Sequence, residues 1–297
     1  MFDYHSIAEL VNAADEQHIK ISELVLKDQA EALEKTPEEV YNQMASDLDV
    51  MKAAVAFGQQ KDQRSTSGLT GGEGYKMNTY ATKTGGGLSG SIISHAIARA
   101  LSVAGCNASM GRIVATPTAG SCGILPGCLL TLLEEKGKSE KDVVMSIFTA
   151  GAFGMVIAQN ASIAGAEGGC QAECGSASGM AAAALVELAG GTPSQCAHAC
   201  AIAIANQLGL VCDPVAGLVE IPCIKRNASG VVIAFSAADM ALAGIPSAIP
   251  VDECIIAMRN VGNALPAALR ETAGGGLATT PTGKQLKEQV FGPDKES

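Results

Sequence analysis

Three of the ten cysteines in this 297-residue chain lie in turns rich in glycine or proline. They are Cys170, Cys212 and Cys223, at positions where neither helix periodicity nor core packing requires a thiol. Thiolates bind iron, and glycine-rich loops let backbone amides approach the sulfur atoms of a cluster. The spacings of 42 and 11 residues (212 − 170 and 223 − 212) are unlike the tight runs of ferredoxins. The residues alone therefore allow an iron-sulfur site, and three buried thiols in turns are the alternative.

A turn of hydroxyl and amide groups at 116–121 is suited to holding a small carboxylate. Its candidate substrate-binding residues are Thr116, Thr118, Gly120 and Ser121. The apolar residues that follow could begin a helix whose N-terminus faces the turn and attracts an anion. An ordinary helix cap is the alternative interpretation.

Other polar residues near these turns could contact a small substrate. The candidate catalytic residues are Asn160, Ser162, Glu167, Arg226 and Arg270, and Glu173 is a further candidate for substrate binding. The amide and hydroxyl groups could orient a substrate, the carboxylates could accept an ammonium group, and a guanidinium could pair with a carboxylate. For each charged residue, a structural salt bridge is the alternative.

The histidines offer no separate metal site. His198 lies between Cys196 and Cys200, but on a helix the spacing i, i+2, i+4 points His198 away from both thiols. His95 is expected to be an ordinary helix residue rather than the base of a reaction. The remaining seven cysteines are interpreted as small apolar core residues, with Cys122 and Cys174 the least certain because they lie close to the proposed site.

The composition predicts an all-α, mostly helical fold. Hydrophobic residues make up 47% of the chain, but aromatic residues only 3%, and glycine occurs 34 times. Small side chains favour closely packed helices over a β-sandwich, which needs β-branched and aromatic residues. We expect one catalytic domain in which central Ala-rich helices hold the cysteine turns at one end. The net charge of −10 argues against nucleic acid as a partner.

Composition changes along the chain divide it into four regions. They are N-terminal helices at 1–57 that pack on the core or a partner, a Gly-rich loop at 58–90, the catalytic domain at 91–278 and a frayed polar tail at 279–297. Thr36 precedes a proline and a glutamate at cap positions, which predicts a helix from Pro37 to about Phe57.

Two stretches without charged residues, 143–166 and 188–212, are long enough to cross a membrane. Polar residues and glycines interrupt both, which favours buried helices and no membrane. The first fifteen residues are acidic rather than basic and apolar, so no signal peptide is expected. We therefore expect a cytoplasmic protein with reduced thiols.

Several long motifs, in the same order, resemble the α chain of iron-sulfur-dependent L-serine dehydratases over roughly 67–278. The motifs that carry the resemblance are 115–120, 160–167 running into Cys170 and Gln171, 208–215, 222–227 and 270–278. The resemblance implies that Cys170, Cys212 and Cys223 hold a 4Fe-4S cluster with one iron that no cysteine ligates.

The same resemblance implies an activity and a partner. The open iron would act as a Lewis acid on the hydroxyl of L-serine while a protein base removes the α-proton, and the enamine would hydrolyse to pyruvate and ammonia without pyridoxal phosphate. Related dehydratases carry a second unit with a Ser-Ser-Ser-His-Thr type motif that is missing here. A separate regulatory β subunit is therefore expected to complete the active site, in an oligomer.

Three other functions remain open. A cysteine desulfidase-like lyase could use a related cluster to expel sulfide. An iron-sulfur sensor or electron carrier would have no use for an open iron. A cysteine-rich structural protein would hold no metal. Turnover of L-serine against L-cysteine, and the colour of the anaerobically purified protein, distinguish these readings.

Overall fold

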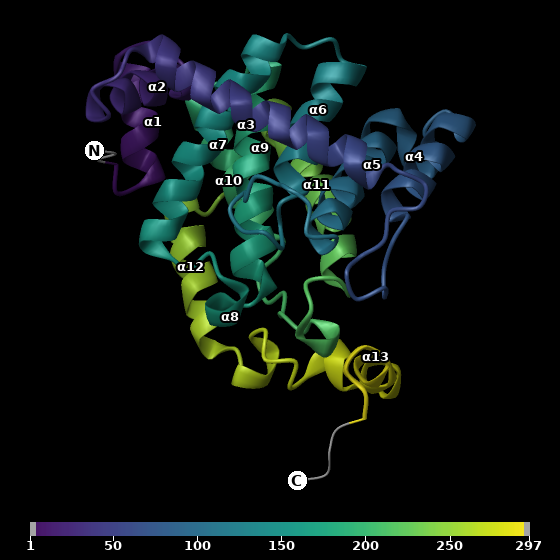
Figure 1. Cartoon of the computed structure of the whole chain (residues 1–297). Coiled ribbons are helices and arrows are strands. Elements are labelled where there is room, and N and C mark those ends of the chain that lie inside the picture. Colours follow the sequence, from purple (N-terminus) through teal and green to yellow (C-terminus); the bar gives the residue numbers. More distant parts are fainter. Residues whose placement is uncertain (1–3, 294–297) are drawn as a thin grey trace.

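The computed structural model describes residues 4–293, and this part of the chain is built from helices (Figure 1). No strand occurs among the described residues, where the one β-like feature is an isolated parallel bridge between Cys212 and Arg270. The all-α prediction is therefore confirmed. The predicted N-terminal region and polar tail also include residues 1–3 and 294–297, which lie outside the described part.

The chain begins with three helices, α1 (Ile7–Glu16), α2 (Ile21–Ala32) and α3 (Pro37–Gly58). The Thr36 hydroxyl accepts a hydrogen bond from the backbone of Glu39, whose carboxylate accepts one from the Thr36 backbone. This reciprocal cap fixes the start of α3 where the sequence predicted it. Helices α1 and α2 bury their apolar faces against the other helices of the molecule.

The segment predicted as a Gly-rich loop at 58–90 is only partly a loop. Helix α4 (Glu73–Thr84) lies within it, between glycines at 72 and 85 that both adopt left-handed backbone conformations. A Cβ atom at Gly58 would overlap the backbone of Ser102, and one at Gly74 would overlap the Ser102 hydroxyl. Glycine at these two positions therefore lets α3 and α4 approach the next helix closely, which the loop prediction missed.

The centre of the molecule is a group of helices rich in alanine and glycine. They are α5 (Gly90–Ala108), α6 (Ile124–Glu135), α7 (Glu140–Asn160), α9 (Ser176–Ala189), α10 (Pro193–Ala205) and α11 (Cys223–Leu242). Nearly every residue of α9 is buried. One long helix, α7, is apolar enough to cross a membrane, but 67% of its apolar stretch is buried inside the molecule.

The second half of the chain also supplies the elements around the cysteine turns and the C-terminal helices. They are α8 (Gly165–Gly168), the single π turn η2 (Gln171–Gly175), η3 (Val215–Gly217), α12 (Val251–Ala264), η4 (Ala267–Leu269), η5 (Gly276–Thr279) and α13 (Pro281–Phe291). The tail predicted as frayed thus contains helix α13, which Thr280 caps through its hydroxyl. The proline at 281 begins this helix instead of disrupting it.

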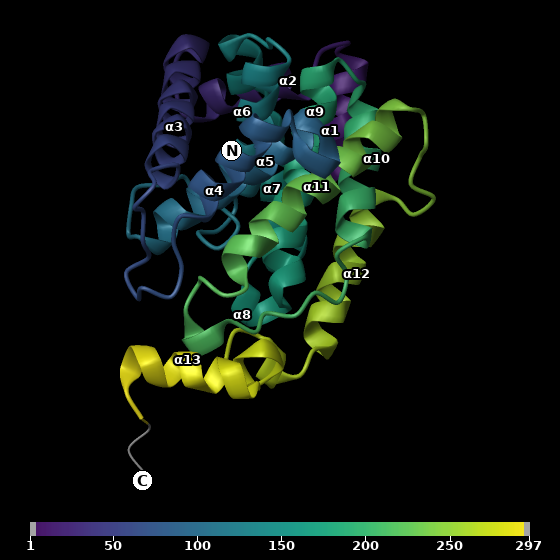
Figure 2. The ribbon, with the colours of Figure 1, turned by 90° about the vertical axis from the view of Figure 1, so that its right-hand side faces the viewer.

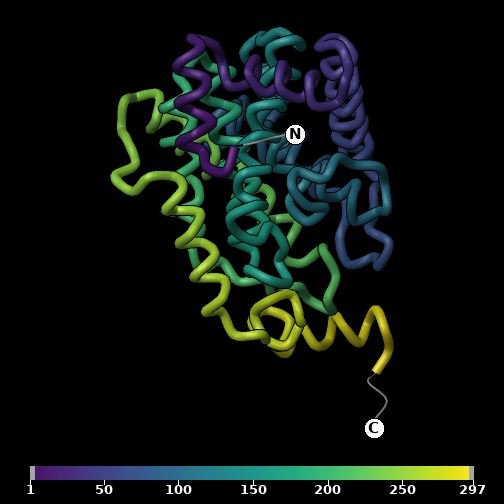
Figure 3. The backbone as a smooth tube through the Cα atoms, turned by 90° about the vertical axis from the view of Figure 1, so that its left-hand side faces the viewer, coloured from purple at the N-terminus to yellow at the C-terminus, as the bar shows by residue number. Residues whose placement is uncertain are grey.

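The two ends of the molecule are built from different parts of the chain. Figures 2 and 3 show α1 and α2 at one end and α8 and α13 at the other. The central helices run between these ends, so the cysteine turns and the N-terminal helices are separated by the length of a helix.

Candidate active site

The three turn cysteines are held by three different kinds of local structure. Cys170 directly precedes the π turn η2, which leads into α9. Cys212 lies in an extended segment, where its backbone exchanges hydrogen bonds of 2.9 and 2.8 Å with Leu269 and Glu271. Cys223 is the first residue of α11. Each thiol is almost fully buried, with an exposed fraction of 6% or less.

The structure brings these thiols together. The Sγ atoms of Cys170 and Cys174 are 3.4 Å apart, and the thiol of Cys212 is near enough to that of Cys170 to shift its pKa. Cys223 lies close enough for the charge on Cys170 to affect its ionisation. Four cysteines therefore share one buried region, including Cys174, which the sequence analysis left as an uncertain core residue. The role of three of them as cluster ligands stays a prediction.

The thiol cluster has one member that ionises easily. The neighbouring thiols of Cys174 and then Cys212, aided by Arg226, lower the pKa of Cys170 well below its ordinary 9.0, against the effect of burial. The same interactions raise the pKa values of Cys174 and Cys212, and burial raises the pKa of Cys223 to about 12. A metal that takes these thiols as ligands must therefore displace protons from most of them.

Two fully buried amide side chains, which the sequence analysis did not assign to the site, fix the turns to each other. Gln171 accepts a hydrogen bond from the Gly209 backbone and donates to the carbonyls of Gly168 and Met258. This ties the Cys170 turn to the segment that leads to Cys212. A buried glutamine that joins its own turn to two distant segments is a positioning residue, because its loss would leave several polar groups unpaired.

Asn227 does the same for the hydroxyl-rich turn. Its amide nitrogen donates to the carbonyls of Gly120 and Cys223 at 2.7 and 3.0 Å, and its oxygen accepts from the Gly123 backbone at 2.8 Å. The turn at 116–121 is therefore held directly against the start of α11. Asn227 belongs to one of the motifs that carry the resemblance, but the presence of an asparagine there did not predict its hydrogen-bond partners.

The hydroxyl-rich turn meets Glu173. The Thr118 hydroxyl donates to the Glu173 carboxylate and lies 3.1 Å from the Ser121 hydroxyl. A Cβ atom on Gly120 would lie 2.5 Å from the same carboxylate, so only glycine leaves room for it. Burial raises the pKa of Glu173 to about 7, against the effect of the Thr118 hydrogen bond. The predicted substrate-binding residues Thr118, Gly120, Ser121 and Glu173 therefore adjoin one another, and the Thr116 hydroxyl points to the carbonyl of residue 122 in the same turn.

Gly165 marks the point where this group reaches the thiols. A Cβ atom there would lie 3.0 Å from the Cys212 sulfur, 3.1 Å from Glu271 Oε2 and 3.4 Å from Glu173 Oε2. The thiol and both carboxylates thus surround one small space that glycine leaves open. Glu271, which has a positive φ of 62°, was not singled out by the sequence analysis. Its place in a resembling motif was the available signal.

Two predicted arginines border the site. Arg226 donates to the Val211 carbonyl at 2.8 Å and to the Asp213 carboxylate at 2.7 Å, and its charge acts on Cys170. Arg270 donates weakly to the Glu167 carbonyl at 3.4 Å, while its Nε is buried without a hydrogen-bond partner. Arg226 is therefore held in place by this chain, and Arg270 keeps a buried donor available.

Three predicted catalytic residues are used differently. The Asn160 amide donates to the carbonyls of His5 and Val156, so it joins α7 to the N-terminal segment instead of reaching the thiols. Ser162 accepts from the Ala164 backbone at 3.0 Å, which makes it a turn residue. With Glu167 it lines a small separate cavity of about 210 Å³ beside α12.

The site suits a cluster better than a single metal ion. Across residues 4–293, no three His, Cys, Asp or Glu side chains are grouped as ligands of one ion. A cubane places each thiolate on a different iron, so its ligands need not converge on one point. The buried thiols of Cys170, Cys212 and Cys223 are of the chemical type that ligates such a cluster, and the unpartnered Nε–H of Arg270 is a hydrogen-bond donor in the same region.

Comparisons with known proteins bear on the family of this chain. The sequence profile of the family "Serine dehydratase alpha chain" matches residues 16–278. The "Probable L-serine dehydratase, alpha chain" of Bacillus subtilis is 53% identical over 97% of this chain and 96% of its own length. The "L-serine dehydratase, alpha chain" of Peptoniphilus asaccharolyticus is 46% identical over 95% of this chain and 97% of its own.

A longer relative also matches. The "L-serine dehydratase" of Streptomyces coelicolor is 39% identical over 91% of this chain, which covers 59% of that protein. The chain belongs to the serine dehydratase alpha chain family. This confirms the resemblance read from the motifs and the prediction of an enzyme.

Proposed function

We propose that this chain is the catalytic α subunit of an iron-sulfur L-serine dehydratase, which eliminates water from L-serine to give pyruvate and ammonia. The observation that carries the proposal is the convergence of Cys170, Cys212 and Cys223 with a polar turn and two arginines at one end of the molecule. The names of the most similar relatives support the substrate and the reaction.

Cys170, Cys212 and Cys223 would hold a 4Fe-4S cluster, leaving one iron without a cysteine ligand. When bound, the cluster would supply a Lewis acid to help hydroxide leave the β-carbon of serine. Proton displacement from the thiols accompanies its insertion, since the pKa values of Cys212 and Cys223 are raised in the chain alone.

The chain's own polar groups would bind and orient the amino acid. As a carboxylate, Glu173 would accept the substrate's ammonium group, and its pKa of about 7 leaves it partly ionised at neutral pH. The buried Nε of Arg270 is available to donate to the substrate carboxylate. Asn227 keeps the turn at 116–121 in register with Cys223, and the buried surroundings exclude water.

A separate β subunit would complete the site. The two relatives that this chain covers to 96% and 97% of their length are called alpha chains, whereas the chain covers only 59% of the longer Streptomyces relative, which is called L-serine dehydratase. We assign the base that removes the α-proton to that partner or to the interface, because no histidine in the described part of the chain lies among the groups that act on the thiols. We also place the enzyme in the cytoplasm, where its ten free thiols would stay reduced.

Anaerobic iron and sulfide analysis, coupled to pyruvate formation from L-serine with and without a β chain, tests the proposal. We expect cluster iron in the α chain alone and turnover only with the partner. L-cysteine, assayed in parallel, distinguishes a desulfidase. Negligible iron after anaerobic reconstitution would overturn the cluster, and full turnover by the α chain alone would overturn the role of the partner.

A further inference from the structure

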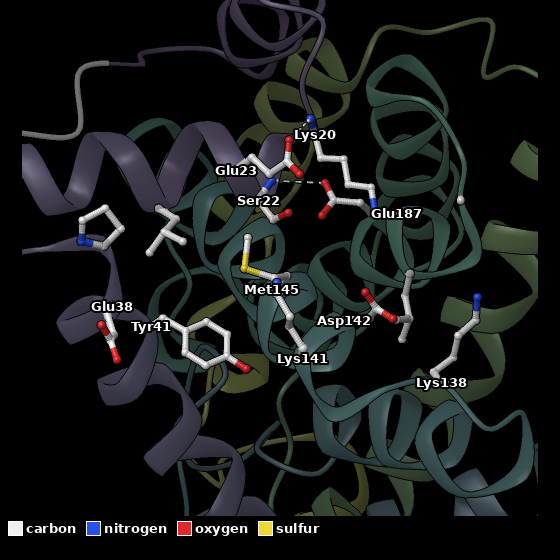
Figure 4. A pocket seen from close by; sticks show the side chains of 14 residues that line it. Lys20, Ser22, Glu23, Glu38, Tyr41, Lys138, Lys141, Asp142, Met145 and Glu187 are labelled. Atoms are coloured by element: carbon white, nitrogen blue, oxygen red, sulfur yellow. Dashed lines mark hydrogen bonds between the residues drawn. The ribbon is translucent and has the colours of Figure 1, made fainter.

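A second, larger cavity lies at the opposite end of the molecule from the cysteines. It has a volume of about 760 Å³ and is bounded by α2 and the start of α3 on one side and by α7 and α9 on the other (Figure 4). Cavities of several hundred Å³ are the size of small-molecule sites. No residue of the candidate active site lines it.

The floor of this cavity holds a buried carboxylate that lacks a counter-charge. Glu187, near the end of α9, is 5% exposed and accepts one hydrogen bond, from the Ser22 backbone at 3.2 Å. Over the described part of the chain, no lysine or arginine forms an ion pair with it. An ionised carboxylate in such a place is unfavourable unless a cation or several donors compensate it.

Two hydroxyl groups beside this carboxylate are also incompletely used. The side chains of Ser22 and Thr149 lie near enough to Glu187 to affect its pKa, yet neither hydroxyl completes a hydrogen bond. Both are fully buried. Ser22 also lines the cavity, and Figure 4 shows it next to Glu187. Buried polar groups without partners are uncommon in native proteins, and an unbound ligand is one explanation for them.

The rest of the cavity lining carries both charges. Lys20, Lys138 and Lys141 line it together with Glu23, Glu38 and Asp142, and none of the three lysines forms an ion pair within the described residues. Lys20 is near enough to favour ionisation of Glu187. Between floor and rim, the walls are apolar, from Leu26, Met145 and other side chains.

This arrangement excludes simpler ligands. Within the described residues no three carboxylates of this lining are grouped to hold a metal cation, and an anion alone would leave the buried carboxylate uncompensated. A ligand with an ammonium group at one end and a carboxylate at the other satisfies both ends of the cavity. The apolar walls then favour a side chain larger and less polar than that of serine.

We propose that this cavity binds an amino acid with an apolar side chain. Its ammonium group pairs with Glu187 and the Ser22 hydroxyl, and its carboxylate faces the lysines at the rim. The site is separate from the cysteines, because Glu187 follows Cys174 by 13 residues (187 − 174), about 20 Å along a helix.

Isothermal titration calorimetry of the full-length chain tests the proposal, with L-leucine, L-methionine and L-phenylalanine as the probes. At least one should bind, and isopentylamine and isocaproate, which each lack one charged group of leucine, should bind at least about tenfold more weakly than leucine. Failure of all three amino acids to bind, or equal binding by isopentylamine, would overturn the assignment. Neither result depends on the cluster or on serine turnover.

Two variants locate the binding. Glu187→Gln keeps an acceptor for the Ser22 backbone but removes the charge, and Ser22→Ala removes the unpartnered hydroxyl. Both should weaken binding, the first by at least about tenfold. Glu31→Gln, on an exposed part of α2 outside the cavity, is the matched control and should bind like the parent. Unchanged affinity in both cavity variants would show that the amino acid binds elsewhere.

Discussion

The two ends of the molecule treat buried charge differently. At the cysteine end, Arg226 pairs with Asp213 and Glu173 accepts from Thr118. At the other end, Glu187 has one backbone donor and no ion pair among the described residues. The pKa values of Glu173 and Glu187 are both raised, and burial is the largest cause in each case. The difference is that the cysteine end also holds a largely buried arginine, which pairs with Asp213 at 2.7 Å, whereas Glu187 has no such ion pair in the described part of the chain.

This contrast distinguishes two ways of preparing a site. The cysteine end is preorganised by residues from distant segments, so its geometry is present before any ligand arrives. The cavity under α2 leaves polar groups for a ligand to satisfy. Substitutions at the first end should therefore affect chemistry, and those at the second should mainly affect stability and binding.

Removal of a predicted ligand should have the largest effect. Cys170→Ala, Cys212→Ala or Cys223→Ala should each reduce pyruvate formation to background and lower the iron content, because a cubane with two cysteine ligands is poorly held. Circular dichroism should show an intact fold. Cys254→Ala makes the same chemical change in α12 and should retain both iron and activity. Equal loss of iron and activity in all four variants would show that the effect comes from misfolding and not from the loss of a ligand.

Loss of the Asn227 amide should have an intermediate effect. Asn227→Ala leaves two carbonyls and one N–H without this partner, which should lower the free energy of unfolding by roughly 2–4 kcal/mol. It should also reduce kcat/KM about 10–100-fold while iron stays bound, the range expected for a residue that orients ligands. The control is Asn206→Ala, at an exposed helix end. A variant with normal kcat/KM and only lower stability would limit Asn227 to a structural role.

Neutralising Glu187 should have the smallest effect, and of opposite sign. Burial raises the pKa of Glu187 above its ordinary 4.5. The protonated side chain therefore stabilises the fold fully at pH values below 4.5, and this contribution is lost as the pH rises through the raised pKa. Glu187→Gln should therefore raise Tm at neutral pH, by roughly 2–4 °C if about 1 kcal/mol is gained. Thermal melts over a pH series should show this gain shrinking toward pH 4.5. A gain that grows on acidification would contradict the sign.

Much of the fold could be predicted from the sequence, because helix caps and apolar stretches are local signals. Thr36 and Pro37 located the start of α3 correctly. Helices α4 and α13 were missed, since their polar sequences with neighbouring glycines and prolines resemble loops. Both are positioned by contacts that are distant in sequence, as Gly74 is by Ser102.

The candidate site was predicted less completely, for the same reason. The three cysteines stood out because glycine and proline surround them. Gln171 and Asn227, by contrast, act through hydrogen bonds to backbone groups of other segments, and no local pattern announces such partners. Asn160 and Ser162 were chosen from a motif. In the structure, the Asn160 amide donates to the Val156 carbonyl of its own helix, and the Ser162 hydroxyl accepts from the Ala164 backbone in a turn.

Gly58 and Gly74, which lie against Ser102, limit the substitutions that the packing of α3 and α4 on α5 tolerates. Gly58 and Gly74 leave no space for a methyl group, so any replacement there forces α3 or α4 away from α5. Such a change would shift whole helices without altering any reactive group. These two positions therefore set the spacing of the helices independently of the cysteines.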